Sequence, residues 1–420
     1  MPRSATPRIK RLLVVLALLA GLVGIYIGWQ PFASTTPGST PIPSVHAVDF
    51  QRRTIYRSPQ HPGYTSWVGA WIMPDKSLMT AFIQATGPID PSQRTMAPTR
   101  VLKAFGVRQW DRKFDFWGLD LAVKYLRSGD GGRTWQQLRS DSFKALYPHG
   151  FTPQATIALK DGTIVRRVNG DDLRQEPSVP HTAYLQRLTP NATHWSAPQV
   201  LMDPAKYTYQ ISRLRYLSDG RLIATGNYWP VPASTPPPKR AKVPSVFLLM
   251  VSSNDGRTWK NGMTIPSDVG YLPGNEWDTA ELPNGDLEAV MRTLDSPTRR
   301  VQVRKQGLLK KEGEGWLLTD VRKAPFPHSG HPELLATHEG PVLDIATTGV
   351  DYTKDGGRTW TPLRFSPRFA YKSNYYPRAV QTDDGVVHVF SHVGGDDAYG
   401  ETDQSITMDT FRLVTEPTSQ

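Results

Sequence analysis

The sequence predicts an all-β protein, a six-bladed β-propeller, and three observations indicate this fold. Six segments repeat an apolar strand, a polar turn and a second apolar strand. A tryptophan follows most of these hairpins, at intervals of 44 to 64 residues. The 420 residues include 37 Pro, 34 Gly and 12 Trp, a composition typical of short strands joined by tight turns.

The hairpins determine the predicted number of blades. Asp-Gly or Asn-Gly between alternating apolar residues is a strong hairpin signal, because such a turn requires a positive φ. Repeats of about 40–65 residues that contain a hairpin and further strand material are typical of propeller blades, so six hairpins predict six blades. The turns are centred on Lys76, Gly162, Gly220, Gly285, Gly340 and Gly385.

The amino terminus predicts an exported protein. Residues 12–29 carry no charged side chain and follow a basic segment. A helix of that length, at about 1.5 Å per residue, is just long enough to cross a bilayer, and the positive flank favours a cytoplasmic start. We expect residues 1–29 to be a retained anchor with the body outside the cytoplasm. A cleaved signal peptide, which would make the protein secreted, is the alternative.

The rest of the chain divides into a linker and the propeller. Residues 30–48 are rich in Pro, Ser and Thr and are expected to stay extended, and residues 49–415 contain the repeats. The chain has no cysteine, which excludes disulfides and thiol chemistry. The net charge of +11 is spread without basic blocks after the first eleven residues. This distribution argues against a nucleic-acid partner and suits a solvated surface or an anionic substrate.

One eight-residue turn occurs three times, as SGDGGRTW, SSNDGRTW and TKDGGRTW. It resembles the Asp-box of the sialidase superfamily of BNR-repeat proteins, with asparagine replacing the aspartate in the middle copy. The resemblance covers roughly residues 50 to 415 and implies a six-bladed propeller with the boxes at its periphery. The boxes are therefore expected to be structural, with the tryptophans packed between blades. Their key residues are Ser128, Asp130, Gly132, Trp135, Asn254, Gly256, Trp259, Asp355, Gly357 and Trp360.

Candidate site residues come from the strand ends opposite the turns, which should meet at one end of the central channel. Polar strand ends also occur simply because they meet water, but charges of both signs converging on a channel call for partners or a ligand. Nine residues before the turn glycine stand Pro153, Ile211, Glu276, His331 and Tyr376. Seven before it stand Ala155, Arg213, Asp278, Glu333 and Arg378. Seven after it stand Asn169, Asn227, Arg292, Thr347 and His392.

The sialidase resemblance implies roles for several of these residues. Tyr376 resembles the family's tyrosine nucleophile, Glu276 the glutamate that takes its proton, and Arg292 an arginine that binds the substrate carboxylate. Blade one lacks the first of the three arginines with which the family surrounds the substrate carboxylate. The segment 87–118 offers three aspartates as the acid/base, of which Asp115 is the candidate; the others are Asp90 and Asp111. The remaining expected substrate contacts are Arg213, Arg378, Asn169, Asp278, Glu333, His331 and His392.

The resulting hypothesis is an exported, membrane-anchored glycosidase that removes a terminal acidic sugar from a glycoconjugate without a cofactor. A non-catalytic glycan-binding propeller and a glycosidase for a different sugar are the alternatives. The stretch HSGHPE could suggest a metal site at His328, His331 and Glu333, but hydrogen-bonding channel residues are the preferred interpretation. The Pro-rich loop 230–244 either borders a substrate groove or is a tolerated insertion.

Overall fold

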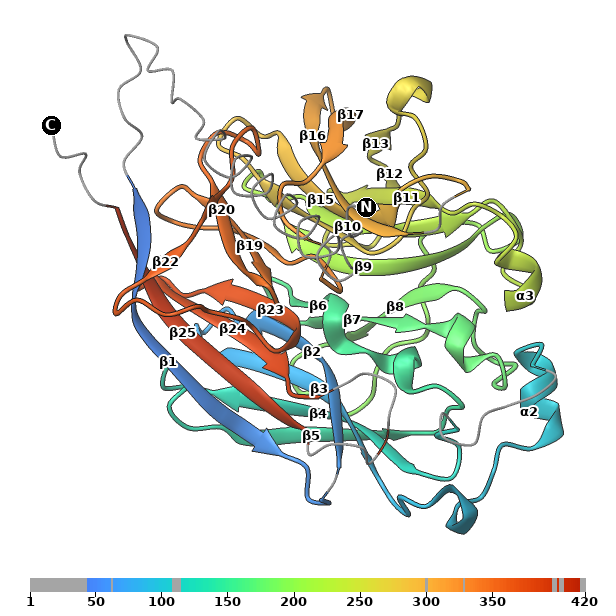
Figure 1. Ribbon diagram of the computed structural model, residues 1–420. Helices are drawn as coiled ribbons and strands as arrows, with labels where there is room; N and C mark the ends of the chain where they lie inside the picture. The colour runs from blue at the N-terminus through green and yellow to red at the C-terminus, as the bar shows by residue number, and fades with distance from the viewer. Residues whose placement is uncertain are drawn as a thin grey trace, which may run out of the picture. The chain divides into compact units, whose positions relative to one another are not determined.

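The computed structural model describes residues 44–61, 63–107, 115–298, 301–327, 329–394, 399 and 404–415. Every strand belongs to one compact unit, Val45–Glu416, and the strands form six sheets. The sheets are arranged as the blades of a propeller, as the sequence predicts (Figure 1). The predicted anchor, residues 12–29, lies outside the described residues. Among the described residues, no helix has the length and apolar character to cross a membrane.

Each blade is a sheet whose strands follow one another outward from the channel. Blade one contains β2 (Tyr64–Ile72), β3 (Leu78–Thr86), β4 (Asp120–Ser128) and β5 (Gln136–Phe143), and blade two contains β6 (Thr156–Ala158), β7 (Ile164–Asn169) and β8 (Ala183–Leu188). Blade three contains β9 (Thr208–Tyr216), β10 (Leu222–Trp229), β11 (Val246–Ser252) and β12 (Lys260–Asn261). Blade four contains β14 (Trp277–Glu281), β15 (Leu287–Leu294), β16 (Gln302–Glu312) and β17 (Gly315–Lys323), with β13 (Met263–Thr264) at its edge. Blade five contains β18 (Leu334–Ala336), β19 (Val342–Ala346), β20 (Gly349–Thr353) and β21 (Thr361–Pro362).

Blade six joins the two ends of the propeller. Its inner strands are β23 (Tyr375–Gln381), β24 (Val386–His392) and β25 (Ser405–Thr415), and its outer strands are β1 (Val45–Arg57) and β22 (Arg364–Phe365). β1 pairs antiparallel with β25 from Val45↔Thr415 to Arg57↔Ser405, and the two strands lie side by side in Figure 1. The predicted linker therefore overlaps the first residues of β1. This pairing joins the amino-terminal and carboxyl-terminal ends of the propeller in one sheet. The ring is closed, since the innermost strands of neighbouring blades contact one another in cyclic order.

Short helices occupy the connections. They are α2 (Thr99–Ala104), α3 (Pro237–Arg240), η1 (Pro91–Gln93), η3 (Pro148–Phe151), η4 (Pro153–Ala155), η5 (Gly170–Leu173) and η6 (Ser267–Val269). Several of them surround the end of the channel where the innermost strands begin.

The predicted hairpins are the first two strands of each blade. The five turn glycines have φ between 82° and 103°, a left-handed conformation that glycine adopts without steric cost. Lys76 has φ 67° in the first blade and so takes the place of the glycine. Local turn chemistry and apolar alternation were sufficient to predict these pairings.

The three Asp-boxes lie between the third and fourth strands of blades one, three and five, away from the channel. Asp130 Oδ1 accepts hydrogen bonds from the backbone N–H groups of Arg133 (3.0 Å) and Thr134 (2.9 Å). Asn254 and Asp355 accept the equivalent bond at 2.9 Å each, so the asparagine retains this part of the turn. The box tryptophans pack against the preceding blade: the ring centroid of Trp135 lies 5.7 Å from that of Phe390, and Trp360 lies 5.1 Å from Phe326.

Candidate active site

A cavity of about 300 Å³ opens at the end of the channel opposite the hairpin turns. All six blades contribute to it. The lining residues are Trp67, His149, Thr152, Gln154, Arg167, Asn169, Asp172, Gln210, Ile211, Ser212, Glu276, His331 and Tyr376. Polar atoms dominate this lining, as expected for a site that binds a hydrophilic ligand.

The residues nine positions before each turn form the rim of this cavity. Ile211, Glu276, His331 and Tyr376 line it directly, and in blade two the neighbours of Pro153 do so. Blade one contributes Trp67, which the sequence analysis missed because the first turn has no glycine. Counting from Lys76, whose backbone adopts the glycine conformation, would have identified Trp67.

Two of the lining aromatic residues have an unusual backbone. Trp67 has φ 52° and Tyr376 has φ 48°, a region that residues with a Cβ rarely occupy. Both lie where the strand register shifts, between Ser66 and Gly69 in one case and between Tyr375 and Arg378 in the other. A β-bulge redirects a side chain and often lies beside an active site. The bulges thus direct both rings into the cavity.

His392 supports Tyr376 from behind and does not line the cavity. Its ring stacks on that of Tyr376, with centroids 6.1 Å apart and planes 9° from parallel. It is fully buried, and its ring nitrogens lie 3.3–3.4 Å from the Ser66 hydroxyl. The structure therefore places His392, predicted as a substrate contact, against Tyr376 and outside the lining of the cavity.

Glu276 forms an ion pair with Arg292 at the cavity. Arg292 Nη1 lies 2.5 Å from Glu276 Oε2, and the same guanidinium donates to Gln302 Oε1 at 2.9 and 3.1 Å. Burial lowers the pKa of Arg292, but the charge of Glu276 and the adjacent Tyr376 phenol outweigh burial and raise it. Arg292 therefore already interacts with Glu276 and Tyr376, and these interactions limit its capacity to bind a substrate carboxylate.

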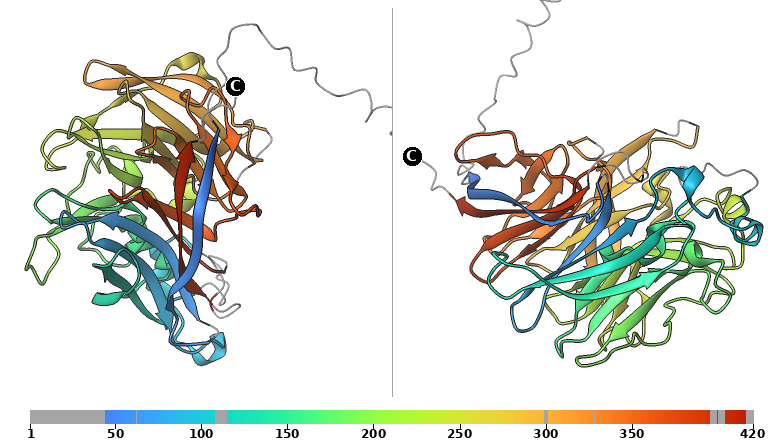
Figure 2. Two further views of the ribbon diagram at one scale, coloured as in Figure 1. Left: turned by 90° about the vertical axis from the view of Figure 1, so that its left-hand side faces the viewer. Right: turned by 90° about the horizontal axis from the view of Figure 1, so that it is seen from below.

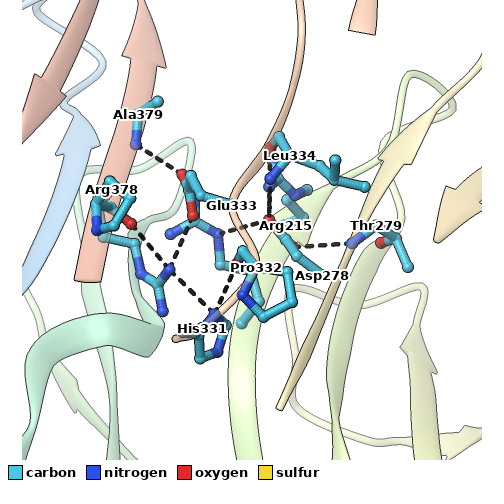
Figure 3. Close-up of polar contacts among 11 residues, drawn as sticks. Arg215, Asp278, Thr279, His331, Pro332, Glu333, Leu334, Arg378 and Ala379 are labelled. Carbon is cyan, nitrogen blue, oxygen red and sulfur yellow. Dashed lines mark hydrogen bonds and ion pairs between the residues drawn. The ribbon is translucent and has the colours of Figure 1, made fainter. Parts of the chain in front are cut away.

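The residues seven positions before the turns lie deeper and pair with one another (Figure 3). Glu333 accepts from Arg213 Nη2 at 2.5 Å, from Arg378 Nη1 at 2.8 Å and from the Ala379 N–H at 2.6 Å. Asp278 pairs with Arg215 at 2.6 Å. The structure therefore brings these residues, predicted as substrate contacts, together in a buried ion-pair network and does not place them in the lining of the cavity.

The network still presents unpaired donors. Arg378 is fully buried, and its Nε and Nη2 have no hydrogen-bond partner among the described residues. The Nδ1 atom of His331 makes both hydrogen-bond contacts of this side chain among the described residues. It lies 3.3 Å from Arg378 Nη1 and 2.6 Å from the Pro332 carbonyl oxygen. Its Nε2 is likewise unpaired within the described structure. His328, the other histidine of the suggested metal site, lies outside the described residues.

Asp115 does not line the cavity. Its Oδ2 accepts from the Ala97 N–H at 2.9 Å and its Oδ1 from the Trp117 N–H at 2.8 Å, so the carboxylate fixes the connection between β3 and β4. Asp90 is exposed and caps η1 through the Ser92 N–H. Asp111 lies outside the described residues. The structure therefore does not bring Asp115, the expected acid/base, to the cavity.

Asp172 is the carboxyl group that the sequence analysis missed. It follows β7 in η5, lines the cavity, and accepts a hydrogen bond from the Asn169 side chain. Burial and the adjacent Asp171 raise its pKa to about 7, against the opposing charge of Arg167. A carboxyl group with this pKa exists in both protonation states near neutral pH, as a general acid/base requires.

Arg167 also lines the cavity and was missed. Burial lowers its pKa to about 10, although the carboxylates of Asp172 and Glu276 act in the opposite direction. Its Nε has no hydrogen-bond partner among the described residues. The positions counted from the turn glycines do not include Arg167, because it lies in the middle of β7, two residues before Asn169.

Comparisons with known proteins show the fold. No protein-family model matches the chain, and no curated protein matches it in sequence. A protein of unknown function from Dyadobacter fermentans has 19% identity and a TM-score of 0.56, and the match covers 89% of this chain and 100% of that one. A mutant α-L-arabinofuranosidase from Fusarium graminearum, solved with an iminosugar inhibitor, has 12% identity over 85% of this chain and 96% of that one, with a TM-score of 0.55. An α-L-arabinanase from Penicillium chrysogenum with arabinobiose has 13% identity over 87% and 98%, with a TM-score of 0.52.

Proposed function

We propose that the protein is a glycoside hydrolase that removes a terminal acidic sugar. The observation that supports this most strongly is the meeting of Tyr376, Glu276 and Asp172 in one cavity. Tyr376 has a strained backbone that directs its ring into the cavity, and Glu276 is held by an ion pair with Arg292. Asp172, with a pKa of about 7, can exchange a proton near neutral pH. These groups are a nucleophile, a base for it and a separate acid.

The proposed reaction has two steps. The Tyr376 oxygen bonds to the anomeric carbon while its proton passes to Glu276. The glycosidic bond breaks, and the leaving oxygen takes the proton of Asp172. Water then attacks the anomeric carbon and gives a proton to the Asp172 carboxylate, and the phenol oxygen leaves with the proton returned by Glu276. Arg292, which lies beside Glu276 and Tyr376, stabilises the negative charge that develops on the phenol oxygen as it gives up its proton.

An acidic sugar is the proposed substrate because of Arg167. Its guanidinium lies at the cavity with an Nε that no described residue pairs, whereas Arg292 is engaged with Glu276. A buried guanidinium with an unpaired nitrogen favours an anionic ligand, and a carboxylate can accept two hydrogen bonds from one guanidinium. The positive charge of Arg378 lies close by, since its Nη1 is 3.3 Å from the cavity residue His331.

A glycosidase for a neutral sugar is the second candidate. Blade one contributes Trp67 to the cavity, an aromatic surface suited to the apolar face of a sugar ring. In that case Glu276 and Asp172 would be the pair of carboxyl groups common to most glycosidases. The similarity of the fold to the arabinose-active enzymes makes arabinofuranosides a reasonable class to include.

The test is hydrolysis of a panel of chromogenic sialosides, uronides and arabinofuranosides by the full-length protein in detergent. The proposal expects turnover of an acidic glycoside that is lost in Tyr376→Phe. Turnover of a neutral glycoside that persists in Tyr376→Phe supports the second candidate. A protein that binds glycans but cleaves none contradicts both and favours a binding propeller.

A further inference from the structure

The loop 230–244, between β10 and β11, lies outside the propeller repeat and carries α3. It extends from blade three toward blade two, and α3 lies beside the connection that carries α2 (Figures 1 and 2). Gly106, just after α2, is so close to Pro238 that an added Cβ would lie about 3.0 Å from the proline ring. The loop is therefore packed on its neighbours.

Two buried arginines connect this loop to the segment that contains Asp172. Asp171, the residue before it, pairs with Arg174 Nε at 2.6 Å and with Arg240 Nη1. The exposed fractions of the three side chains are 3%, 4% and 11% for Asp171, Arg174 and Arg240. Breaking a buried ion pair by removing one partner is unfavourable, so this contact constrains both segments.

The loop backbone is held as well. Arg174 Nη2 donates to the carbonyls of Ala233 at 2.8 Å and Thr235 at 2.7 Å. The guanidinium of Arg240 lies over the Trp229 ring, 4.7 Å from its centroid, which fixes the arginine from the side of its own blade. The loop and η5 thus share two arginines, one from each side.

We propose that Arg240 and Asp171 form a clamp between loop 230–244 and η5 that positions Asp172 as the proton donor of the cavity. Arg240 is a positioning residue in this proposal, since it contacts Asp171 and does not line the cavity. The proposal rests on the function proposed above for Asp172. It also assigns a role to a loop that the repeat does not require.

The clamp sets the charge around Asp172. The groups that face it are Asp171 from its own element, Arg167 and Asn169 from β7, Arg240 from α3, and Tyr147 from the segment before η3. Burial and Asp171 favour the protonated acid, whereas Arg167, Asn169 and Arg240 favour the carboxylate. Loss of the Arg240 charge should therefore raise the pKa of Asp172, and loss of the Asp171 charge should lower it.

The test measures the titration of Asp172 directly, in full-length protein labelled with ¹³C at the aspartate carboxyl groups. The Asp172 signal is the one that disappears in Asp172→Asn. Arg240→Gln should move its midpoint up, and Asp171→Asn should move it down, each by roughly one pH unit. Arg240→Lys retains the charge and should change the midpoint less. Lys239→Gln removes an exposed charge from the same helix and is the matched control.

Opposite shifts in Arg240→Gln and Asp171→Asn support the clamp, because a purely structural contact would not produce them. An unmoved midpoint in both variants, or an equal shift in Lys239→Gln, overturns it. If Arg240→Gln fails to fold, Asp171→Asn decides alone, since an unmoved or raised midpoint there is equally contrary. The readout does not require activity. Opposite shifts in a protein that cleaves no glycoside therefore support the clamp and refute only the proposed function.

Discussion

Trp67 and Tyr376 occupy the same position in the first and last blades, and both have a left-handed backbone, with φ of 52° and 48°. Because blades one and six are neighbours in the ring, two bulges direct two aromatic rings into one cavity from adjacent strands. Strain of this kind persists only where the surrounding structure enforces it, and it is concentrated at functional sites. The equivalent positions of the other blades bear different side chains on a relaxed backbone.

Tyr376→Phe should abolish most turnover while the fold is retained. The ring keeps its stacking on His392 but loses the attacking oxygen, so kcat should fall by at least about a hundredfold. The measurement is steady-state hydrolysis of the best substrate from the panel. Tyr375→Phe is the control, since Tyr375 is 49% exposed and does not line the cavity. Equal activity in the two variants would eliminate Tyr376 as the nucleophile.

Asp172→Asn should lower turnover most for substrates with poor leaving groups. An amide cannot protonate the leaving oxygen, so the loss should be about 10²–10⁴-fold for a natural linkage and smaller for an activated aryl glycoside. Asp115→Asn is the comparison, because Asp115 bonds backbone N–H groups away from the cavity. A greater catalytic loss in a folded Asp115→Asn protein than in Asp172→Asn would instead identify Asp115 as the acid/base.

The sequence predicted the fold because the signals for it are local. Each hairpin and each Asp-box closes through residues a few positions apart. Most of the residues nine positions before the turns line the cavity because every blade repeats the same strand geometry relative to its turn. The residues seven positions before the turns do not line the cavity, because each lies two positions further along a strand, roughly 7 Å deeper, where side chains meet each other. Asp172 lies beyond the repeat in η5, and nothing in its immediate sequence indicates that it faces the cavity.

Asp130→Ala should lower the melting temperature without changing the turnover of the folded protein. The Asp130 carboxylate accepts hydrogen bonds from the backbone of Arg133 and Thr134 and from the Thr134 hydroxyl at 2.6 Å, which holds its pKa well below the usual range. Asp130→Asn should lose less, because Asn254 keeps an equivalent turn in blade three. Thermal unfolding and specific activity are the measurements. Loss of activity with unchanged stability would show that the box contributes to chemistry.

The full-length protein should remain in the membrane fraction after an alkaline wash if residues 12–29 anchor it. Deletion of residues 1–29 should release it, because the linker and propeller carry no comparable apolar run. Amino-terminal sequencing of the released and membrane fractions provides the check. A soluble product that begins near residue 35 or 48 in the wild type would indicate cleavage of a signal peptide.

Glu288 should make the stability of the propeller depend on pH. It is 1% exposed on β15, next to Gly357 of the third Asp-box, and its Oε1 has no partner among the described residues. Burial raises its pKa to about 8, and Asp355 adds to this while Arg322 opposes it. Because the folded protein holds this proton more tightly than the unfolded chain, the contribution of Glu288 to stability is complete below about pH 4 and is lost as the pH rises to about 8.

Glu288→Gln removes this titration while retaining the shape of the side chain. The variant should gain stability over the wild type between pH 5 and 8, by an amount on the order of 3–5 kcal/mol at the upper end if the whole shift is expressed. Urea unfolding at pH 5, 6.5 and 8 measures the difference, and a common loss from other groups cancels between the two proteins. Glu312→Gln on the same blade is the control, since Glu312 is exposed and its replacement should leave the pH profile unchanged. If the difference between Glu288→Gln and the wild type stays constant across this range, Glu288 does not change its protonation there. Its buried oxygen would then need a permanent partner in the folded protein.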